Sequence, residues 1–497
     1  MMMRWPLQLC LIFLLALALD RACQGNEMGA PSAPPTAEAS AEDAQGDEAL
    51  AAARRLDRLA RNADGTLRPL PPEEHMRRAA IYFANRAFDE AREHWQTLIT
   101  RYPNDANVPA ALFGIGRAFY QERRYGEALP FFERVGREYP HTREGRDGFY
   151  FVAPTLLRMG RAAEAALRYQ AYIERFPDGE RISDAYLNAI DTWREAGRID
   201  EALRWIERTR QRFADAPTTQ AALFAHLRLE TARANWASAA RLAETLARAP
   251  LTATMTNAAE ISYLRAYSLE RLGRTAEAAR IYQSIADAPS SYYGWLATQR
   301  LERLGRDARR AAAVRDERVR REIKAAAANY PVPYRETILR AVQGRDLDPR
   351  LVLAIMRQES EFRPQARSRA AARGLMQLTM DAAKRYGPRV QLADVTETDL
   401  YRPEVSIRIA VAYLEELSKL FARSTEAVVA SYNGGEDNVA RWLERSGRHD
   451  PGIFTAEIGF AETKNYVFKV MTNYRAYCAL YTTDLRPHTA PEKISAR

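Results

Sequence analysis

One glutamate stands out because of where helical spacing places it. Asp348 followed by Pro349 is typical of a helix start, since the carboxylate caps free N–H groups and proline suits the first helical position. Apolar residues then recur at helical intervals, and Glu359 falls on the same stripe as Val352 and Met356. A carboxylate on a buried helix face loses hydration, which raises its pKa. Such a group could donate a proton near neutral pH.

The spacing alone leaves a second interpretation open. Glu359 could be a partly buried glutamate held by an arginine and without a catalytic role, because structural ion pairs outnumber catalytic acids. Pro364 prevents the helix from running much further. Glu361 lies about 200° further round the helix and is expected to face water.

A second stretch, Gly374–Gln377, follows in the order Gly-Leu-Met-Gln. Glycine lets the backbone approach a ligand closely. Met376 offers an adaptable apolar contact, and the amide of Gln377 both donates and accepts hydrogen bonds. By itself such a stretch is more often a loop packed on a core.

Two later stretches carry polar groups at element ends. Ser431-Tyr432-Asn433 runs into two glycines, and its Tyr and Asn could hold the amide and hydroxyl groups of a sugar, although Asn-Gly-Gly is also ordinary turn chemistry. Glu462 and Tyr466 open the last predicted helix. There Glu462 could simply be a favourable acid at a helix N-terminus, and Tyr466 a core residue.

In this order, the stretches resemble the catalytic domain of the soluble lytic murein transglycosylases. That family shows Glu-Ser, Gly-Leu-Met-Gln, Ala-Tyr-Asn and Glu-Thr-x-x-Tyr-Val. Here they stand as Glu359-Ser360, Gly374–Gln377, Ser431–Asn433 and Glu462–Val467, with serine in place of the family's alanine at 431. The resemblance covers roughly residues 330–482.

The resemblance implies a mainly helical, lysozyme-like catalytic domain. Its activity would be cleavage of the β-1,4 bond between N-acetylmuramic acid and N-acetylglucosamine in peptidoglycan, without water, to give 1,6-anhydro ends. Glu359 would be the catalytic acid and then the base. Ser360 and Gln377 would orient that acid or the sugar, and Met376 and Tyr432 would line the cleft. The full set of substrate-binding residues that the resemblance implies is Ser360, Met376, Gln377, Tyr432, Asn433, Glu462 and Tyr466.

Ordinary glycosidases use two carboxylates at a set separation. The sequence shows no obvious second carboxylate beside Glu359, so Glu359 is predicted to act alone. Two alternatives remain: a lysozyme-type peptidoglycan hydrolase that uses the same acid, and a periplasmic repeat protein whose sugar-binding module is inactive. No Cys/His cluster has metal-ligand spacing, so neither a metal nor a cofactor is expected.

Upstream of these motifs the chain is repetitive. Tyr102-Pro103, Tyr139-Pro140 and Phe176-Pro177 recur every 37 residues, and Phe213 continues the register. Each unit has the pattern of two amphipathic helices joined by a turn, which cannot bury its apolar face without stacked neighbours. This resembles the tetratricopeptide-like repeats. The predicted fold class is therefore all-α: a superhelical solenoid followed by a lysozyme-like domain.

The predicted organisation has six parts. Residues 1–25 are a signal peptide, with the apolar core Leu7–Leu19, and residues 26–72 are a disordered Ala/Pro-rich acidic tether with a short helix. The others are tetratricopeptide-like repeats (73–300), a charged, solvated linker helix (301–330), the catalytic domain (331–485) and a C-terminal tail (486–497). The signal predicts export to the periplasm. Cys23 leaves a lipid anchor open as an alternative, although Asp20 fits a lipoprotein signal poorly.

Length and charge narrow the partners. A chain of 497 residues suggests two to four domains, and its net charge of +9 is spread along the sequence. No run of basic and aromatic residues favours nucleic acid. The partner that the resemblance implies is the glycan strand of peptidoglycan. Cell-envelope proteins could bind the repeats, and a lipid at Cys23 would associate the chain with the outer membrane.

Overall fold

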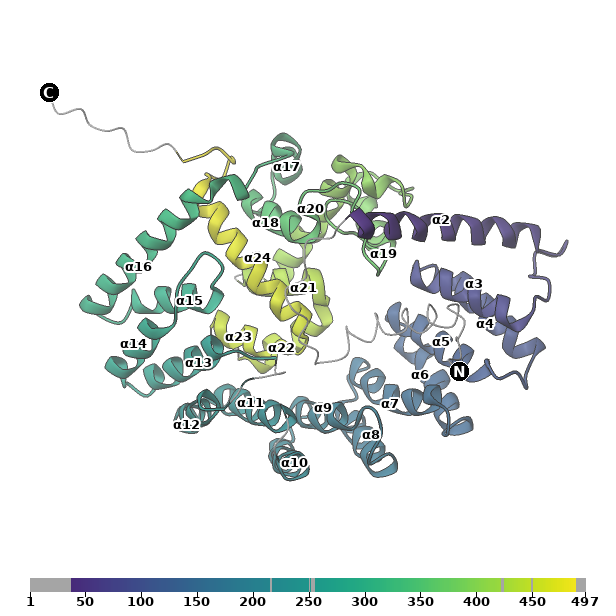
Figure 1. The fold of residues 1–497 in the computed structure, drawn as a ribbon, viewed down its shortest axis with the longest axis horizontal. Helices are drawn as coiled ribbons and strands as arrows, with labels where there is room; N and C mark the ends of the chain where they lie inside the picture. The colour runs from purple at the N-terminus through teal and green to yellow at the C-terminus, as the bar shows by residue number, and fades with distance from the viewer. Residues whose placement is uncertain are drawn as a thin grey trace, which may run out of the picture. The chain divides into compact units, whose positions relative to one another are not determined.

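The computed structural model describes residues 37–214, 217–249, 251, 255–421, 424–447 and 450–488, with side chains from residue 46. Within these ranges every element is a helix, and extended segments meet only in isolated bridges, which confirms the all-α prediction (Figure 1). No helix among them is long and apolar enough to cross a membrane. The predicted signal peptide, Cys23, residues 26–36 of the tether and residues 489–497 of the tail lie outside the described ranges.

The described chain forms two compact units. The N-terminal unit comprises residues 37–225 together with 368–371, and the C-terminal unit comprises 226–367 and 372–488. Their boundary falls inside the predicted repeats. The last repeat helices are therefore part of the same compact unit as the predicted catalytic domain.

The first described helix, α2 (Ala37–Leu59), differs from the sequence prediction. The segment 26–72 was expected to be a disordered tether with only a short helix, but α2 already begins at Ala37 and is 23 residues long. This segment is rich in alanine and glutamate, which favour helix even where few residues are apolar. Further along, Leu50 and Ala53 are buried in the core of the N-terminal unit, so packing supports the helix.

The remaining helices of the N-terminal unit pack against one another in chain order (Figure 1). They are α3 (Pro72–Ala84), α4 (Phe88–Arg101), α5 (Val108–Gln121), α6 (Tyr125–Glu138), α7 (Arg143–Arg158), α8 (Ala162–Arg175), α9 (Ile182–Glu195) and α10 (Ile199–Arg212). Helix α11 (Pro217–Ala232) comes next in the chain and runs into the second unit.

The predicted repeat register has a backbone counterpart. The helices α4, α6, α8 and α10 end at the aromatic residues that mark the repeat, Tyr102, Tyr139, Phe176 and Phe213. The turn inside each pair contains one left-handed residue, and these residues follow the same spacing: Arg86, Arg123, Gly160, Gly197 and Ala234. Each unit is thus a helical hairpin of one design.

The C-terminal unit contains the helices that hold the predicted site. They are α12 (Trp236–Ala247), α13 (Ala258–Arg271), α14 (Thr275–Ser284), α15 (Tyr292–Leu301), α16 (Arg306–Ala325), α17 (Arg335–Val342), α18 (Pro349–Ser360), α19 (Met380–Tyr386), α20 (Pro403–Leu420), α21 (Thr425–Gly434), α22 (Glu436–Arg445), α23 (Pro451–Glu457) and α24 (Ala461–Leu480), with 3-10 turns at Ala327–Asn329, Gly387–Val390 and Asp399–Tyr401. Helix α24 contacts α15, α16, α18 and α21 (Figure 1). The short α23 begins after Asp450, whose side chain caps it.

The charged helix α16 is not a solvated linker, contrary to the sequence prediction. Ala308, Ala312, Val319 and Ile323 form a buried stripe along it. Val319 and Ile323 pack with residues near the end of α24. Charged residues between the stripe positions concealed this apolar face, which one side of a helix needs for docking.

This packing can be tested at Ile323, which is 1% exposed. Ile323→Ala should destabilise the protein by about 2–4 kcal/mol, because it removes buried methyl groups and leaves a cavity. Thermal or urea unfolding measures the change. Arg321→Ala, on the exposed side of the same helix, should stay within about 0.5 kcal/mol of the parent. Equal effects of the two changes would contradict the docking of α16.

Candidate active site

Helix α18 carries Glu359 into the site. Its start is the predicted cap, because Asp348 Oδ1 accepts the backbone N–H of Arg350 at 2.9 Å. Asp348 Oδ2 also accepts the Tyr474 hydroxyl at 2.9 Å, which attaches the start of α18 to α24. Helical geometry ends at Ser360, and Glu361 is left-handed (φ 50°) and exposed, as expected. Glu359 therefore lies in the last turn, next to a change of chain direction.

The carboxylate of Glu359 is paired with a tyrosine. The hydroxyl of Tyr466, in the second turn of α24, donates to Glu359 Oε1 at 2.6 Å. Burial raises the pKa of Glu359 to about 8, the Tyr466 hydrogen bond opposes this, and repulsion from Glu462 adds to it. No arginine or lysine forms an ion pair with Glu359 among the described residues. The structure therefore does not favour the alternative in which Glu359 only forms an ion pair with an arginine.

Tyr466 is a reliable donor at physiological pH. Its side chain is buried, and burial raises its pKa well above the usual range, with the Glu359 charge acting in the same direction. Its proton therefore stays on the phenol oxygen while Glu359 titrates. The pair provides a carboxyl group that is protonated at neutral pH and a fixed donor that stabilises the carboxylate once the proton has left.

The Gly374–Gln377 loop is tightly packed and is bonded to the last residue of α18. Gly374 has φ +77°, and a Cβ there would lie 1.9 Å from the carbonyl oxygen of Leu400. Only glycine fits this position. The Ser360 hydroxyl donates to the Leu375 carbonyl oxygen at 2.8 Å, which fastens the loop to the residue after Glu359. Ser360 is buried, and its hydroxyl holds the loop, which is a different contact from the expected one to the acid or the sugar.

Met376 also differs from its expected role. Its side chain is fully buried and lies in the core, so it does not line a cleft. Its backbone is what serves the site: the carbonyl oxygen accepts the Tyr432 hydroxyl at 2.8 Å, and the N–H donates to Ser406 Oγ at 3.2 Å. Gln377 is only partly buried, and its amide nitrogen donates to the carbonyl oxygens of Ala366 and Gly374. Its amide oxygen is the group suited to accept from a sugar hydroxyl.

Tyr432 and Asn433 approach the site from the end of α21. The Tyr432 ring lies 5.3 Å from that of Tyr413, which in turn stacks on Tyr386 at 4.6 Å. Asn433 is exposed, and its side-chain oxygen accepts the Thr463 hydroxyl at 2.6 Å. This bond fixes the Asn433 amide so that its nitrogen can donate to a ligand.

The predicted residues therefore fall into two groups. Tyr466 binds the Glu359 carboxylate directly, and Tyr432 and Glu462 interact with it electrostatically. Gln377 is partly buried in the Gly374–Gln377 loop, and Asn433 is exposed at the end of α21. Ser360 and Met376 form the second group: both are buried, Ser360 binds the Leu375 carbonyl oxygen, and the Met376 carbonyl oxygen binds Tyr432. Sequence reasoning assigned no role to Ser406, Tyr413 or Thr463. Thr463 stood inside a quoted motif and could have been chosen; Ser406 offered no sequence signal.

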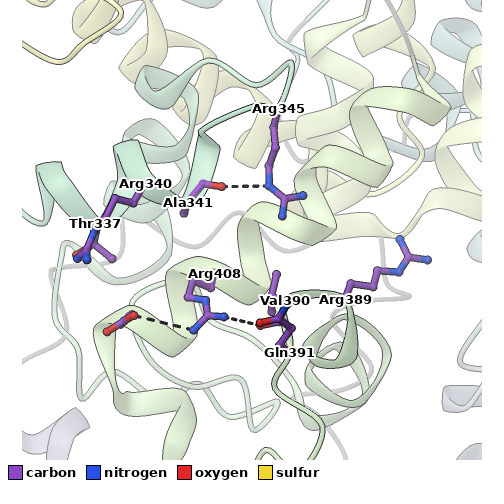
Figure 2. Close-up of a pocket in the computed structure, with 9 residues that line it drawn as sticks. Thr337, Arg340, Ala341, Arg345, Arg389, Val390, Gln391 and Arg408 are labelled. Atoms are coloured by element: carbon purple, nitrogen blue, oxygen red, sulfur yellow. Dashed lines mark hydrogen bonds and ion pairs between the residues drawn. The ribbon is translucent and has the colours of Figure 1, made fainter.

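A separate hollow of about 350 Å³ contains none of the predicted site residues. Three of its four arginines have partners: Arg345 pairs with Glu415, Arg389 with Glu416, and Arg408 with the carbonyl oxygen of Val390. Figure 2 shows that the ends of these three side chains do not converge on one point. We therefore interpret it as a surface ion-pair network. Among the described residues no group of His, Cys, Asp and Glu could hold a metal ion.

The loop geometry gives a stability test. Gly374→Ala should cost more than about 3 kcal/mol, because it adds a backbone clash to left-handed strain. Gly344→Ala is the matched control: Gly344 is also left-handed (φ +73°), but nothing lies within 4 Å of a Cβ there, so only about 1–2 kcal/mol is expected. Chemical denaturation of both variants measures the difference. A cost for Gly374→Ala no larger than that for Gly344→Ala would contradict the loop packing.

Comparison with known proteins identifies two kinds of domain. Residues 336–454 match the family model described as "Transglycosylase SLT domain", and residues 88–141, 153–217 and 224–292 match "Tetratricopeptide repeat". The soluble lytic murein transglycosylase of Salmonella typhimurium is 33% identical over 150 residues, which are 30% of this chain and 23% of that protein. The Escherichia coli protein of the same name is 31% identical over 157 residues, 31% of this chain and 24% of its own length.

These alignments span about a quarter of the length of the relatives. Among solved structures, the lytic transglycosylase Slt from Pseudomonas aeruginosa is 21% identical, with a TM-score of 0.44 over 89% of this chain and 80% of its own. The resemblance predicted from the motifs is confirmed by the family models: the chain carries a transglycosylase SLT domain preceded by tetratricopeptide repeats.

Proposed function

We propose that this protein is a peptidoglycan lytic transglycosylase that cleaves the bond between N-acetylmuramic acid and N-acetylglucosamine without water. The observation that carries the proposal is the Glu359–Tyr466 pair, whose glutamate lies within the residues that match the transglycosylase SLT domain. It offers one carboxyl group with a pKa of about 8, which is protonated at neutral pH and ready to act as an acid.

In the first step Glu359 protonates the glycosidic oxygen that leaves. The bond from that oxygen to the anomeric carbon breaks, and the carbonyl oxygen of the muramyl acetamido group bonds to the anomeric carbon. The substrate thus supplies the nucleophile that a second carboxylate would otherwise provide. The Tyr466 hydroxyl, which already donates to Oε1, stabilises the negative charge that appears on Glu359.

In the second step the Glu359 carboxylate takes the proton of the muramyl C6 hydroxyl. The C6 oxygen attacks the anomeric carbon, the bond to the acetamido oxygen breaks, and a 1,6-anhydro ring results. Glu359 regains its proton, so one residue serves as acid and then as base. Gln377, Asn433 and Tyr432 hold the sugar around it.

The alternative is hydrolysis by the same acid. Glu462 is the one other carboxylate whose charge acts on the pKa of Glu359 among the described residues. It is exposed, which suits a substrate contact more than a base that must be partly desolvated. Lytic transglycosylation is therefore favoured over water attack.

Localisation and partners belong to the same proposal. The N-terminal signal would direct the chain to the periplasm, where its substrate is the glycan strand of peptidoglycan. The helical repeats would bind that strand or other cell-envelope proteins, and a lipid on Cys23 would hold the protein at the outer membrane.

Product mass and one variant test the reaction. Purified protein should release muropeptides one water lighter than the products of a hydrolase, as mass spectrometry measures directly. Glu359→Gln should lower kcat about 10³-fold or more, because it cannot donate a proton. Its unfolding temperature should not fall, since the variant removes a carboxyl group whose ionisation the fold opposes. Products with reducing ends would establish hydrolysis, and an active Glu359→Gln would refute the assignment.

The pH profile tests the two neighbours of Glu359 in opposite directions. The acid form is needed for bond cleavage, so activity should fall as pH rises through the pKa of about 8. Tyr466→Phe removes a bond that stabilises the carboxylate, which raises this pKa and moves the alkaline limb upward. Glu462→Gln removes repulsion, which lowers the pKa and moves the limb downward. Limbs that shift in the same direction would contradict the assigned electrostatics.

A further inference from the structure

The first two turns of α24 carry interacting side chains on two opposite faces. Glu462 and Tyr466 are four residues apart on one face, and both act on Glu359. Lys464 lies between them in sequence and points to the opposite side of the helix. Its side chain is only 2% exposed. The position of this segment sets the distance between the Tyr466 hydroxyl and the Glu359 carboxylate.

Lys464 is anchored on a repeat helix. Its Nζ lies 2.8 Å from Glu260 Oε1 in α13 and donates to the Met255 carbonyl oxygen at 3.0 Å. Glu260 is fully buried, and its Oε1 also accepts the hydroxyl of Tyr293 in α15 at 3.0 Å. Glu260 lies within residues 224–292, which match the tetratricopeptide repeat. The anchor therefore comes from outside the transglycosylase domain.

The same two repeat-side helices bind other elements near the site. Tyr292 donates to Glu426 at 3.4 Å, at the start of the helix that ends in Tyr432 and Asn433. The Tyr293 hydroxyl lies 3.0 Å from that of Thr455 in α23. Helices α13 and α15 thus hold α21, α23 and α24 through buried hydrogen bonds and one ion pair.

Stability alone does not account for the buried pair. Burial lowers the pKa of Lys464, because the charged form loses water, and the second oxygen of Glu260 has no hydrogen-bond partner among the described residues. Apolar side chains of similar volume often serve a protein interior as well as, or better than, such a pair. An ion pair with hydrogen bonds is directional, so it fixes the position of α24 relative to α13. Apolar contacts alone would allow the two helices to shift against each other.

We propose that Lys464 and Glu260 are positioning residues, whose ion pair holds the first two turns of α24 so that Tyr466 stays within hydrogen-bond reach of Glu359. This inference rests on the proposed function for its kinetic consequences, but its structural consequence at Glu359 does not. A hydroxyl–carboxylate bond weakens steeply beyond about 3 Å, so a displacement of about 1 Å removes it.

The surroundings determine the direction of the effect. Glu359 faces Tyr466 and Glu462 from α24 and Tyr432 from α21. Lys464 faces Glu260, and the charges of Arg228 and Glu457 also reach it. When the Tyr466 bond is lost while burial and Glu462 remain, the Glu359 carboxylate becomes harder to form.

The test is the double variant Glu260→Leu/Lys464→Met in the full chain, which replaces the pair by apolar groups. It should keep its cooperative unfolding, lower kcat about 10- to 100-fold with little change in KM, and move the alkaline limb of the pH profile upward. The matched control is Asp287→Leu/Arg475→Met. This removes another buried ion pair of α24, whose atoms lie 2.7 Å apart, far from Tyr466 along the helix. The control should keep the parent pH profile.

An infrared measurement separates this inference from the proposed function. The protonated Glu359 carboxyl band, identified by its loss in Glu359→Gln, can be titrated without substrate. Its midpoint should rise in the Glu260→Leu/Lys464→Met variant and stay unchanged in the control. An unchanged midpoint in both would overturn the positioning role, whatever the enzymatic activity. If the double variant does not fold, Glu260→Gln, which keeps shape and acceptor but removes the charge, decides by the same midpoint.

Discussion

The hydrogen bond between Tyr466 and Glu359 joins two helices that are far apart in the sequence, and the rest of the site depends on it. Glu359 lies at the end of α18, while Tyr466 lies near the start of α24. The bond at 2.6 Å requires both ends to be placed to within a fraction of an ångström. Much of the C-terminal unit can be understood as what fixes these two ends.

At the end of α18, the position of Glu359 is fixed mainly by backbone geometry. The left-handed residues after Ser360 end the helix sharply, and the Ser360 hydroxyl binds the Leu375 carbonyl oxygen of the neighbouring loop. Gly374 allows that loop to press against Leu400. On the α24 side the restraint comes from side chains, with Lys464 on a repeat helix and Thr463 on Asn433. The acid is thus held by a rigid loop, and its partner by a network of polar contacts.

Much of this could be predicted from local sequence. The Asp348-Pro349 start, the apolar stripe to Glu359 and the 37-residue register depend on short-range spacing, and the structure reproduces them. What could not be predicted depends on contacts across long separations. The motif containing Met376 gave no sign that its side chain would be buried while its backbone served Tyr432. Lys464 looked like a variable position between two motif residues, because its partner Glu260 lies about two hundred residues earlier. For α16 and α2, charge and composition predicted solvent-exposed segments, but residues of both helices are packed in hydrophobic clusters.

The boundary of the compact units also bears on how the protein can be divided. Composition changes near Tyr334, which makes that residue look like a natural place to cut. A fragment that starts there would lack α13 and α15, so Lys464, Glu426 and Asp450 would lose their buried partners and meet water or remain unpaired. The compact unit that contains these partners begins near His226, inside the repeats. A shortened chain would have to keep these last hairpins, so the unit that packs together is larger than the residues that match the transglycosylase family model.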